Sequence, residues 1–148
     1  MMNTMRTRSK EETQNFGKQF GEALLSRTLV TLEGDLGAGK TTFVQGILEG
    51  LGALPPYPSP TFVLMNQYEL PRSTATGIRR VYHADAYRVG RTDFEKLGFL
   101  EWCADPAGVV LLEWPERLGD LVPEQRVSIH LKHVSDSERS IDILNLTA

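Results

Sequence analysis

The stretch Gly34-Asp35-Leu36-Gly37-Ala38-Gly39-Lys40-Thr41 fits the pattern G-x-x-x-x-G-K-[S/T]. It lies between an apolar run at residues 28–32 and an amphipathic stretch that begins near Thr41. This strand, loop and helix setting is typical of a phosphate-binding loop. Glycines let the backbone turn tightly, so successive N–H groups can point into one concavity, and the helix dipole adds to their attraction for phosphate. The sequence therefore predicts a nucleotide-phosphate site here.

The residue types of this loop suit a magnesium nucleotide. Lys40 would reach the β- and γ-phosphates, and the hydroxyl of Thr41 would complete part of a Mg²⁺ shell otherwise made of phosphate oxygens and water. The alternative is a structural turn with Lys40 as a solvated charge, but such a turn would not need three glycines and a Lys-Thr pair. The residues expected to bind the nucleotide are Asp35, Leu36, Gly37, Ala38, Gly39, Lys40, Thr41 and Thr42.

Length and charge limit the class of protein. The 148 residues fit one domain, and we expect residues 1–8 to form a flexible N-terminal segment. With 16 basic and 19 acidic residues, the chain lacks the positive excess of a free-standing nucleic-acid binder, so any RNA would be held by another protein. The single Cys103 is expected to be a buried thiol. Residues 1–15 are polar, which predicts neither a signal peptide nor a membrane span and indicates a cytoplasmic chain.

The pattern of apolar residues predicts alternating helices and strands. We expect helices at residues 10–26, from about residue 41 to the glycines at 50 and 52, and at 92–100 with Phe94, Leu97 and Leu100 on one side. Strands are expected at residues 28–32, 61–68, 81–85, 109–112, 126–132 and 140–146. The four prolines in residues 54–60 exclude a regular helix or a central strand there.

These elements predict an α/β fold of the P-loop NTPase kind. The short connection between the strands at 61–68 and 81–85 favours antiparallel pairing. The aliphatic run at 109–112 is typical of a parallel sheet buried on both faces. We therefore expect a three-layer sandwich with a mostly parallel central sheet, some antiparallel strands, and a ligand at the carboxyl ends of the strands.

Glu113 directly follows the aliphatic run and is a candidate for the Mg²⁺ site. A carboxylate opposite the phosphates could touch the metal, hold a metal-bound water or polarise a water. A strand-end carboxylate in solvent is the alternative. Trp114 could stack on a base, or it could have an ordinary packing role.

The segment His83-Ala84-Asp85-Ala86-Tyr87-Arg88 brings further polar groups to one face, because alternate residues of an extended chain point the same way. Asp85 could orient the attacking water or hold a Mg²⁺-bound water, and Arg88 could balance charge on the phosphoryl group. A polar strand end with a His-Asp hydrogen bond is the alternative. In Ser59-Pro60-Thr61-Phe62, a hydroxyl could sense the γ-phosphate as a switch does, or the segment could be a plain junction between loop and strand.

Four motifs occur together in this chain, namely Gly34-Asp35-Leu36-Gly37-Ala38-Gly39-Lys40-Thr41-Thr42-Phe43, Ser59-Pro60-Thr61-Phe62, His83-Ala84-Asp85-Ala86-Tyr87-Arg88 and Leu112-Glu113-Trp114-Pro115-Glu116. With these motifs in this order, over about residues 10–146, the chain closely resembles the bacterial TsaE (YjeE) family. The resemblance implies a cytoplasmic ATPase that uses ATP and Mg²⁺. It also implies a role in making N6-threonylcarbamoyladenosine at position 37 of tRNA. The implied partners are TsaD, which transfers the threonylcarbamoyl group, and TsaB, with tRNA reached indirectly through their complex and no membrane involved.

The resemblance also implies roles by position. Lys40 contacts phosphates, Thr41 and Glu113 belong to the Mg²⁺ site directly or through water, and Trp114 lies near the nucleotide. Lys40, Asp85 and Glu113 are the expected catalytic residues; either carboxylate could position the attacking water. The candidate switch contacts are Thr61, Tyr87 and Arg88.

Other functions fit the sequence less well. A regulatory GTPase would need an Asn-Lys-x-Asp segment, which the sequence lacks. A small-molecule kinase would need an acceptor pocket and an arginine-bearing lid, for which the chain has little spare length. A nucleotide-dependent binding module, in which ATP orders the segment from Pro55 to Pro60 for a partner, stays open.

Overall fold

One mixed sheet of seven strands, in the order β1-β7-β6-β2-β5-β4-β3, organises the chain. The structure, a computed structural model, describes residues 2–145. The strands are β1 (Met2–Thr7), β2 (Thr28–Glu33), β3 (Met65–Glu69), β4 (Arg80–Asp85), β5 (Gly108–Glu113), β6 (Val127–His133) and β7 (Arg139–Asn145). The helices are α1 (Lys10–Glu22), α2 (Lys40–Leu51), α3 (Arg91–Leu97) and α4 (Phe99–Ala104), with short 3₁₀ turns at Pro115–Arg117 and Gly119–Leu121.

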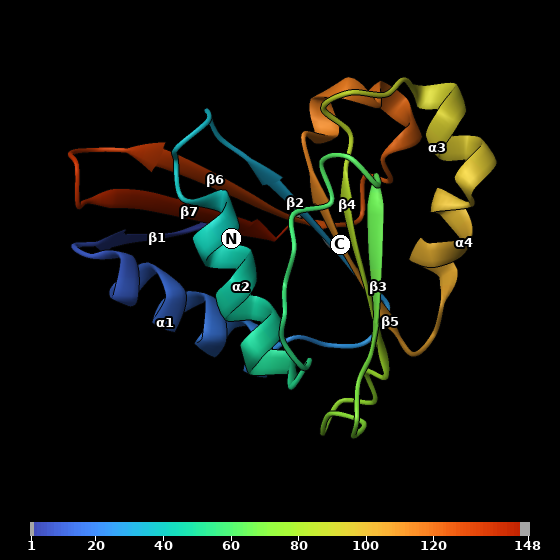
Figure 1. Cartoon of the computed structure of the whole chain (residues 1–148), viewed down its shortest axis with the longest axis horizontal. Helices are drawn as coiled ribbons and strands as arrows, with labels where there is room; N and C mark the ends of the chain where they lie inside the picture. The colour runs from blue at the N-terminus through green and yellow to red at the C-terminus, as the bar shows by residue number, and fades with distance from the viewer. Residues whose placement is uncertain (1, 146–148) are drawn as a thin grey trace.

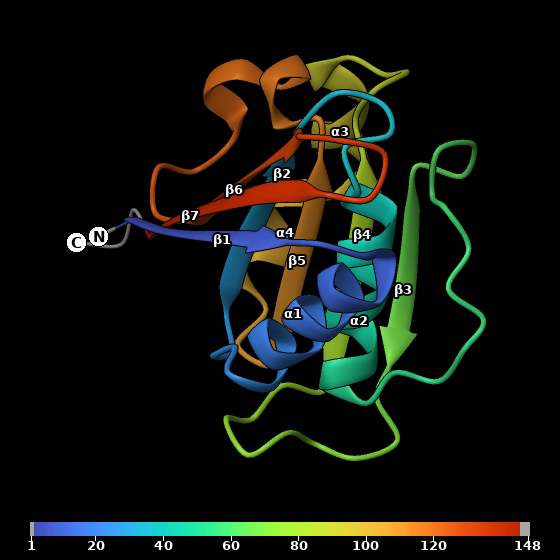
Figure 2. The ribbon, with the colours of Figure 1, turned by 90° about the vertical axis from the view of Figure 1, so that its left-hand side faces the viewer.

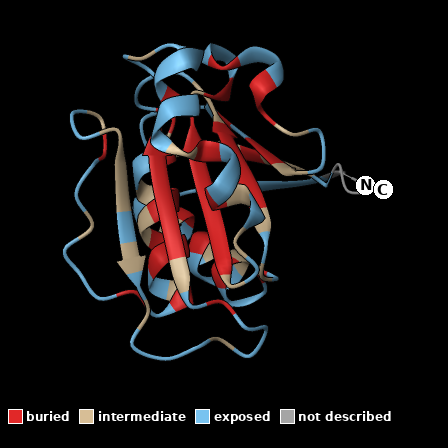
Figure 3. Cartoon of the chain, turned by 90° about the vertical axis from the view of Figure 1, so that its right-hand side faces the viewer, coloured by how far each residue is buried: buried red, intermediate tan, exposed pale blue. Residues whose placement is uncertain are grey.

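The helices cover the sheet on both faces. Helices α1 and α2 lie on one face and α3 and α4 on the other (Figure 1). Strand β5 is buried along its whole length: Val109 and Leu111 pack in the α1–α2 core, whereas Val110 and Leu112 pack in the α3–α4 core. Figure 3 shows the central strands as buried bands. The aliphatic run therefore sits, as predicted, in a strand buried on both faces.

Parallel pairing occupies the middle of the sheet, and antiparallel pairing its flanks. Strand β2 pairs in parallel with β5 and β6, and β4 with β5; the β1–β7, β6–β7 and β3–β4 pairs are antiparallel. β1 and β7 run across the direction of β2 and β5 in Figure 2, as strong sheet twist produces. The α/β prediction is confirmed, with a sheet that is partly parallel. The register places Asp85 opposite Glu113, so the two acidic residues end neighbouring strands at one edge.

Close contact between α1 and α2 fixes the position of the second helix. An ideal Cβ added at Gly46 would lie 2.1 Å from the carbonyl oxygen of Gln14, and one added at Gly17 would lie 2.4 Å from that of Phe43. Similar approaches occur at Gly21 and Gly50. Glycine at these four positions lets the two backbones touch. Because α2 begins at Lys40, this contact also positions the candidate site.

The N-terminal segment is a strand, so the expectation of a flexible segment over residues 1–8 is wrong for the described part of it. β1 pairs along its length with β7. Thr7 is buried, and its Oγ1 lies 2.6 Å from that of Thr13. This pairing joins distant parts of the chain, so a polar local sequence gives no sign of it. The predicted end of the last strand at residue 146 lies outside the described residues.

Two other predicted boundaries are wrong because of local backbone geometry. The strand expected at 61–68 begins only at Met65, since Leu64 N donates to Pro60 O at 2.7 Å and Leu64 has φ 71°. The backbone pairing of this segment with β4 therefore stops at the turn, where Asp85 N donates to Leu64 O.

The helix expected at 92–100 is two short helices, α3 and α4. Gly98 has φ 95° and ends α3, so the apolar residues on either side do not form one stripe. Phe94 is buried, but Leu97 and Leu100 are exposed. The first helix likewise ends at Glu22 rather than near residue 26.

Among residues 2–145, none of the helices combines the length and apolar character that crossing a membrane requires.

Candidate functional site

The glycine-rich loop (residues 34–39) joins β2 to α2 and needs glycine for its shape. A Cβ at Gly34 would lie 2.5 Å from the carbonyl oxygen of Leu131 on β6. Gly39, with φ 100°, caps α2 without any side-chain hydrogen bond. Phe43 N makes the bond to Gly39 O, so the N–H groups before it lack partners inside the helix. The start of α2 therefore offers donors and a positive dipole end to an anion.

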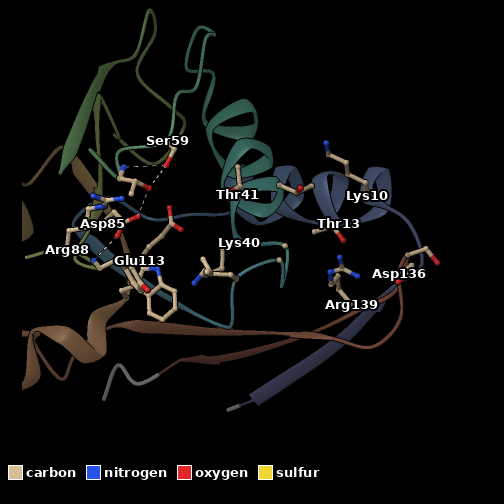
Figure 4. A pocket seen from close by; sticks show the side chains of 18 residues that line it. Lys10, Thr13, Lys40, Thr41, Ser59, Asp85, Arg88, Glu113, Asp136 and Arg139 are labelled. Carbon is tan, nitrogen blue, oxygen red and sulfur yellow. Dashed lines mark hydrogen bonds between the residues drawn. The ribbon is translucent and has the colours of Figure 1, made fainter. Parts of the chain in front are cut away.

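A cavity of about 630 Å³ lies beside this loop and the start of α2 (Figure 4). This volume suits a drug-sized or cofactor-sized ligand. Asp85 and Glu113 line one end, at the carboxyl ends of β4 and β5. Lys10 of α1 and Arg139 of β7 line the other, and Lys40 lies between the two ends (Figure 4).

Lys40 is buried at the centre of the site. Its Nζ donates to Gly34 O at 2.5 Å and lies 3.6 Å from the centroid of the Trp114 ring. Trp114 has φ 60°, an unusual conformation for a non-glycine residue, at the turn that directly follows β5. Burial lowers the pKa of Lys40, while nearby carboxylates, Glu113 first among them, oppose that shift. An anionic ligand would add to this opposing effect.

Asp85 is held by the segment that precedes β3. Its Oδ2 accepts a hydrogen bond from Thr61 Oγ1 at 3.1 Å, and its Oδ1 accepts one from Tyr87 N at 2.8 Å. The Oγ of Ser59 lies 2.7 Å from Thr61 Oγ1. A hydrogen-bonded chain thus connects the proline-containing segment to a buried carboxylate of the cavity.

His83 pairs with Glu113. The Nε2 atom of His83 lies 2.6 Å from Oε2 of Glu113, and both side chains are buried. The alternative prediction, a hydrogen bond between His83 and Asp85, is wrong, because the Asp85 carboxylate accepts its side-chain hydrogen bond from Thr61. Two acidic residues that start as neighbours are therefore held by different partners.

The candidate switch residues surround the Asp85 end of the cavity. Thr61, Tyr87 and Arg88 all line it. The guanidinium of Arg88 lies 4.5 Å from the ring of Phe62, which is 79% exposed. The centroids of the Tyr87 and Trp114 rings are 4.8 Å apart. Trp114 thus packs on protein side chains while also lining the cavity.

The loop residues predicted to bind phosphate line two different hollows of the surface. The residues that line the cavity are Leu36, Gly37, Gly39, Lys40, Thr41 and Thr42. Asp35 and Ala38 line a smaller hollow beside His130 and Lys132 instead. The structure thus brings most of the predicted set, with Asp85 and Glu113, around one space.

Comparison with known proteins shows the family to which this chain belongs. A family model described as threonylcarbamoyl adenosine biosynthesis protein TsaE matches residues 7–141. The chain belongs to the TsaE family. The TsaE protein of Bacillus subtilis is 38% identical over 136 residues, which cover 92% of this chain and 81% of the relative. The TsaE protein of Treponema pallidum is 37% identical over 138 residues, which cover 93% of this chain and 96% of the relative.

A solved structure of a relative has the same fold. The crystal structure of Bacillus subtilis YdiB matches with a TM-score of 0.80 and 32% identity, covering 99% of this chain and 86% of that chain. The mixed sheet described above therefore agrees with an experimental structure of a relative.

The donor set of the cavity fits a magnesium ion held partly by phosphates. Among residues 2–145, no group of three or more His, Cys, Asp or Glu side chains forms a metal-binding cluster. Mg²⁺ usually needs no such cluster, since it retains waters and binds one or two carboxylates together with substrate phosphates. The hydroxyl of Thr41 and the carboxylate of Glu113 both line the cavity and could serve in this way.

One end of the cavity was missed by the sequence analysis. Its lining residues are Lys10, Thr13, Asp136, Ser137 and Arg139. Lys10 and Thr13 belong to α1. Asp136, Ser137 and Arg139 reach the site because β6 pairs in parallel with β2, which brings the β6–β7 turn to the edge where the glycine-rich loop begins. A hairpin could be expected from residues 134–138, but its place beside the loop depends on strand order. No local sequence signal gives that order.

Proposed function

We propose that this chain is a Mg²⁺-dependent P-loop ATPase that acts in the synthesis of threonylcarbamoyladenosine in tRNA. The observation that carries the proposal is that Lys40 and the start of α2 line the same cavity as Asp85 and Glu113. Family membership supports the pathway, since the relatives bear the name tRNA threonylcarbamoyladenosine biosynthesis protein TsaE. TsaD and TsaB are the proposed partners, tRNA is reached through their complex, and the proposed location is the cytoplasm.

The proposed roles follow from position and chemistry. The first-turn N–H groups of α2 and the ammonium of Lys40 bind the phosphates, Lys40 exchanging its bond to Gly34 O for a bond to phosphate. Bound Mg²⁺ would neutralise charge on the phosphate oxygens. Thr41 and Glu113 hold that ion, directly or through water. Asp85, fixed by Thr61, is the first choice for orienting the attacking water, and Glu113 is the second.

A second candidate function is a nucleotide-dependent binding module with incidental hydrolysis. Phe62 and Val63 are 79% and 62% exposed, and they directly follow Thr61, which bonds to Asp85. A ligand that changes the Thr61–Asp85 bond would change how these apolar side chains are presented to a partner. Both functions use the same cavity.

Hydrolysis of Mg²⁺-ATP by the purified protein, alone and with TsaD and TsaB, separates the two. We expect slow hydrolysis alone and a clear rise when the partners are added. Lys40→Ala should weaken nucleotide binding and abolish the rise, because the phosphates lose their cationic partner. Lys18→Ala is a matched control, since Lys18 lies on the surface of α1 and pairs with Glu49.

The outcomes differ for each reading. A hydrolysis rate that does not change when TsaD and TsaB are added, together with ATP-dependent docking of these partners, would favour the binding module. Unchanged ATP affinity and turnover in Lys40→Ala would refute the assignment of the cavity.

A further inference from the structure

His83 is buried beside the candidate Mg²⁺ site without lining the cavity itself. Its side chain is 5% exposed and that of Glu113 is 8% exposed. Glu113 lines the cavity, and His83 is not among the lining residues. The contact between Nε2 and Oε2, at 2.6 Å, engages one carboxylate oxygen and leaves Oε1 available to the cavity. His83 can therefore act on the site through Glu113.

The strand register explains why Glu113 needs a partner of its own. Asp85 is the Cα partner of Glu113 on the parallel strands β4 and β5, so two carboxylates start from adjacent positions. Side chains alternate along a strand, so His83 shares a face with Asp85. Thr61 and the Tyr87 N–H hold Asp85. The imidazole of His83 holds Glu113 separately, which keeps the two like charges in defined positions.

The geometry also assigns the direction of this hydrogen bond. Among the described residues, Nδ1 of His83 is buried and has no hydrogen-bond partner. If the proton were on Nδ1, two acceptors would face each other at 2.6 Å. With the proton on Nε2, the ring donates to Glu113 and only an acceptor is left unpaired.

We propose that His83 is a positioning residue that holds Glu113 in the orientation required for magnesium, an inference that rests on the proposed function. Hydrogen bonds to metal-binding carboxylates orient them, and losing such a bond typically weakens metal affinity or activity by about 10- to 100-fold. Phosphate binding at the start of α2 does not involve His83. The loss should therefore appear in Mg²⁺ affinity and not in nucleotide affinity without metal.

Two amide variants provide the test. His83→Gln places an amide nitrogen at about the distance of Nε2 from the backbone, whereas His83→Asn places it near the position of Nδ1 and out of reach of Glu113. Calorimetry would measure MgCl₂ binding to protein saturated with a non-hydrolysable ATP analogue, and analogue binding in EDTA. Thermal unfolding of the free proteins would check the fold.

We expect His83→Asn to weaken Mg²⁺ binding by about tenfold or more, His83→Gln to restore most of it, and neither to change analogue binding in EDTA by more than about twofold. Adding His83→Asn to Glu113→Gln should weaken Mg²⁺ binding no further, since both changes act on one contact. Unchanged Mg²⁺ affinity in His83→Asn would overturn the inference. So would an equal loss of analogue binding in EDTA, which indicates a general structural role.

Wild-type protein offers an independent readout. His83 is one of three histidines, and its ring NMR signals should shift when MgCl₂ is added to the analogue complex, while those of the exposed His133 should not. No shift at His83 would overturn the inference even if the variants fail to fold. If wild-type protein does not bind the analogue at all, the proposed function fails first. Analogue binding with no effect at His83 would refute only the positioning role.

Discussion

Replacing Gly46 by alanine tests the contact that sets α2, and with it Lys40, against α1. The new Cβ would lie 2.1 Å from Gln14 O, where unstrained heavy atoms keep about 3.5 Å. The obstacle is backbone, so the helices must separate by about 1 Å or more. Such overpacking costs about 3 kcal/mol at the upper end of its range, and the better helix propensity of alanine offsets about 1 kcal/mol. We expect a net loss of about 2 kcal/mol in the free energy of unfolding.

Thermal unfolding followed by far-ultraviolet circular dichroism measures this loss. For a domain of this size, about 2 kcal/mol corresponds to a Tm lower by about 4–8 °C. Gln19→Ala, at an exposed position of α1, is a control for the general effect of alanine and should change stability by no more than about 0.5 kcal/mol. A Gly46→Ala protein that melts at or above the wild-type temperature would refute the reasoning, since the helix contact would then not depend on a missing Cβ.

Three further predictions concern individual side chains. Asp85→Ala should keep much of its affinity for Mg²⁺-ATP but lose turnover, because the proposed work of Asp85 is done in the transition state; weaker affinity with normal kcat would assign it to substrate positioning. Hydrogen bonding by the Arg80 guanidinium holds the pKa of Asp105 well below its ordinary value, so Asp105 stabilises the fold above the unfolded-state pKa of about 3.9 and loses this contribution as pH falls below it. The difference in Tm between wild type and Asp105→Asn should therefore shrink from about pH 6 to about pH 3, and a constant difference would contradict the charge effect. Burial raises the pKa of the Cys103 thiol to about 12, so Ellman's reagent should react with it slowly near pH 8 until the protein unfolds, and equal rates before and after unfolding would rule this out.

Local sequence was sufficient where one segment determines its own structure. The strand, loop and helix from β2 to α2 follow from apolar patterning and from glycines that allow one tight turn. The buried strand β5 follows from an uninterrupted aliphatic run. The placement of Lys40, Asp85 and Glu113 around one cavity was predictable as well. Lys40 begins the helix after the glycine-rich loop, and the two carboxylates end neighbouring parallel strands at the same edge of the sheet.

Contacts between distant segments were not predictable from local patterns. β1 forms because it pairs with β7, and Arg139 reaches the cavity because of the strand order. The pairing of His83 with Glu113 depends on a turn at Leu64, which brings Thr61 to Asp85 and leaves the histidine to another partner. Side-chain alternation along β4 identifies the shared face but not which donor each carboxylate receives.

The two carboxylates of the site are anchored in different parts of the fold, which separates their proposed roles. Glu113 is bonded to a buried histidine of the sheet, so its position is fixed by the same core that fixes β4 and β5. Asp85 is bonded to Thr61, in a segment without regular secondary structure that carries the exposed Phe62. A partner that displaces this segment would therefore alter Asp85 while leaving Glu113 in place. With the roles proposed above, partner proteins that stimulate hydrolysis should accordingly change kcat through Asp85 and leave the affinity for Mg²⁺ unchanged.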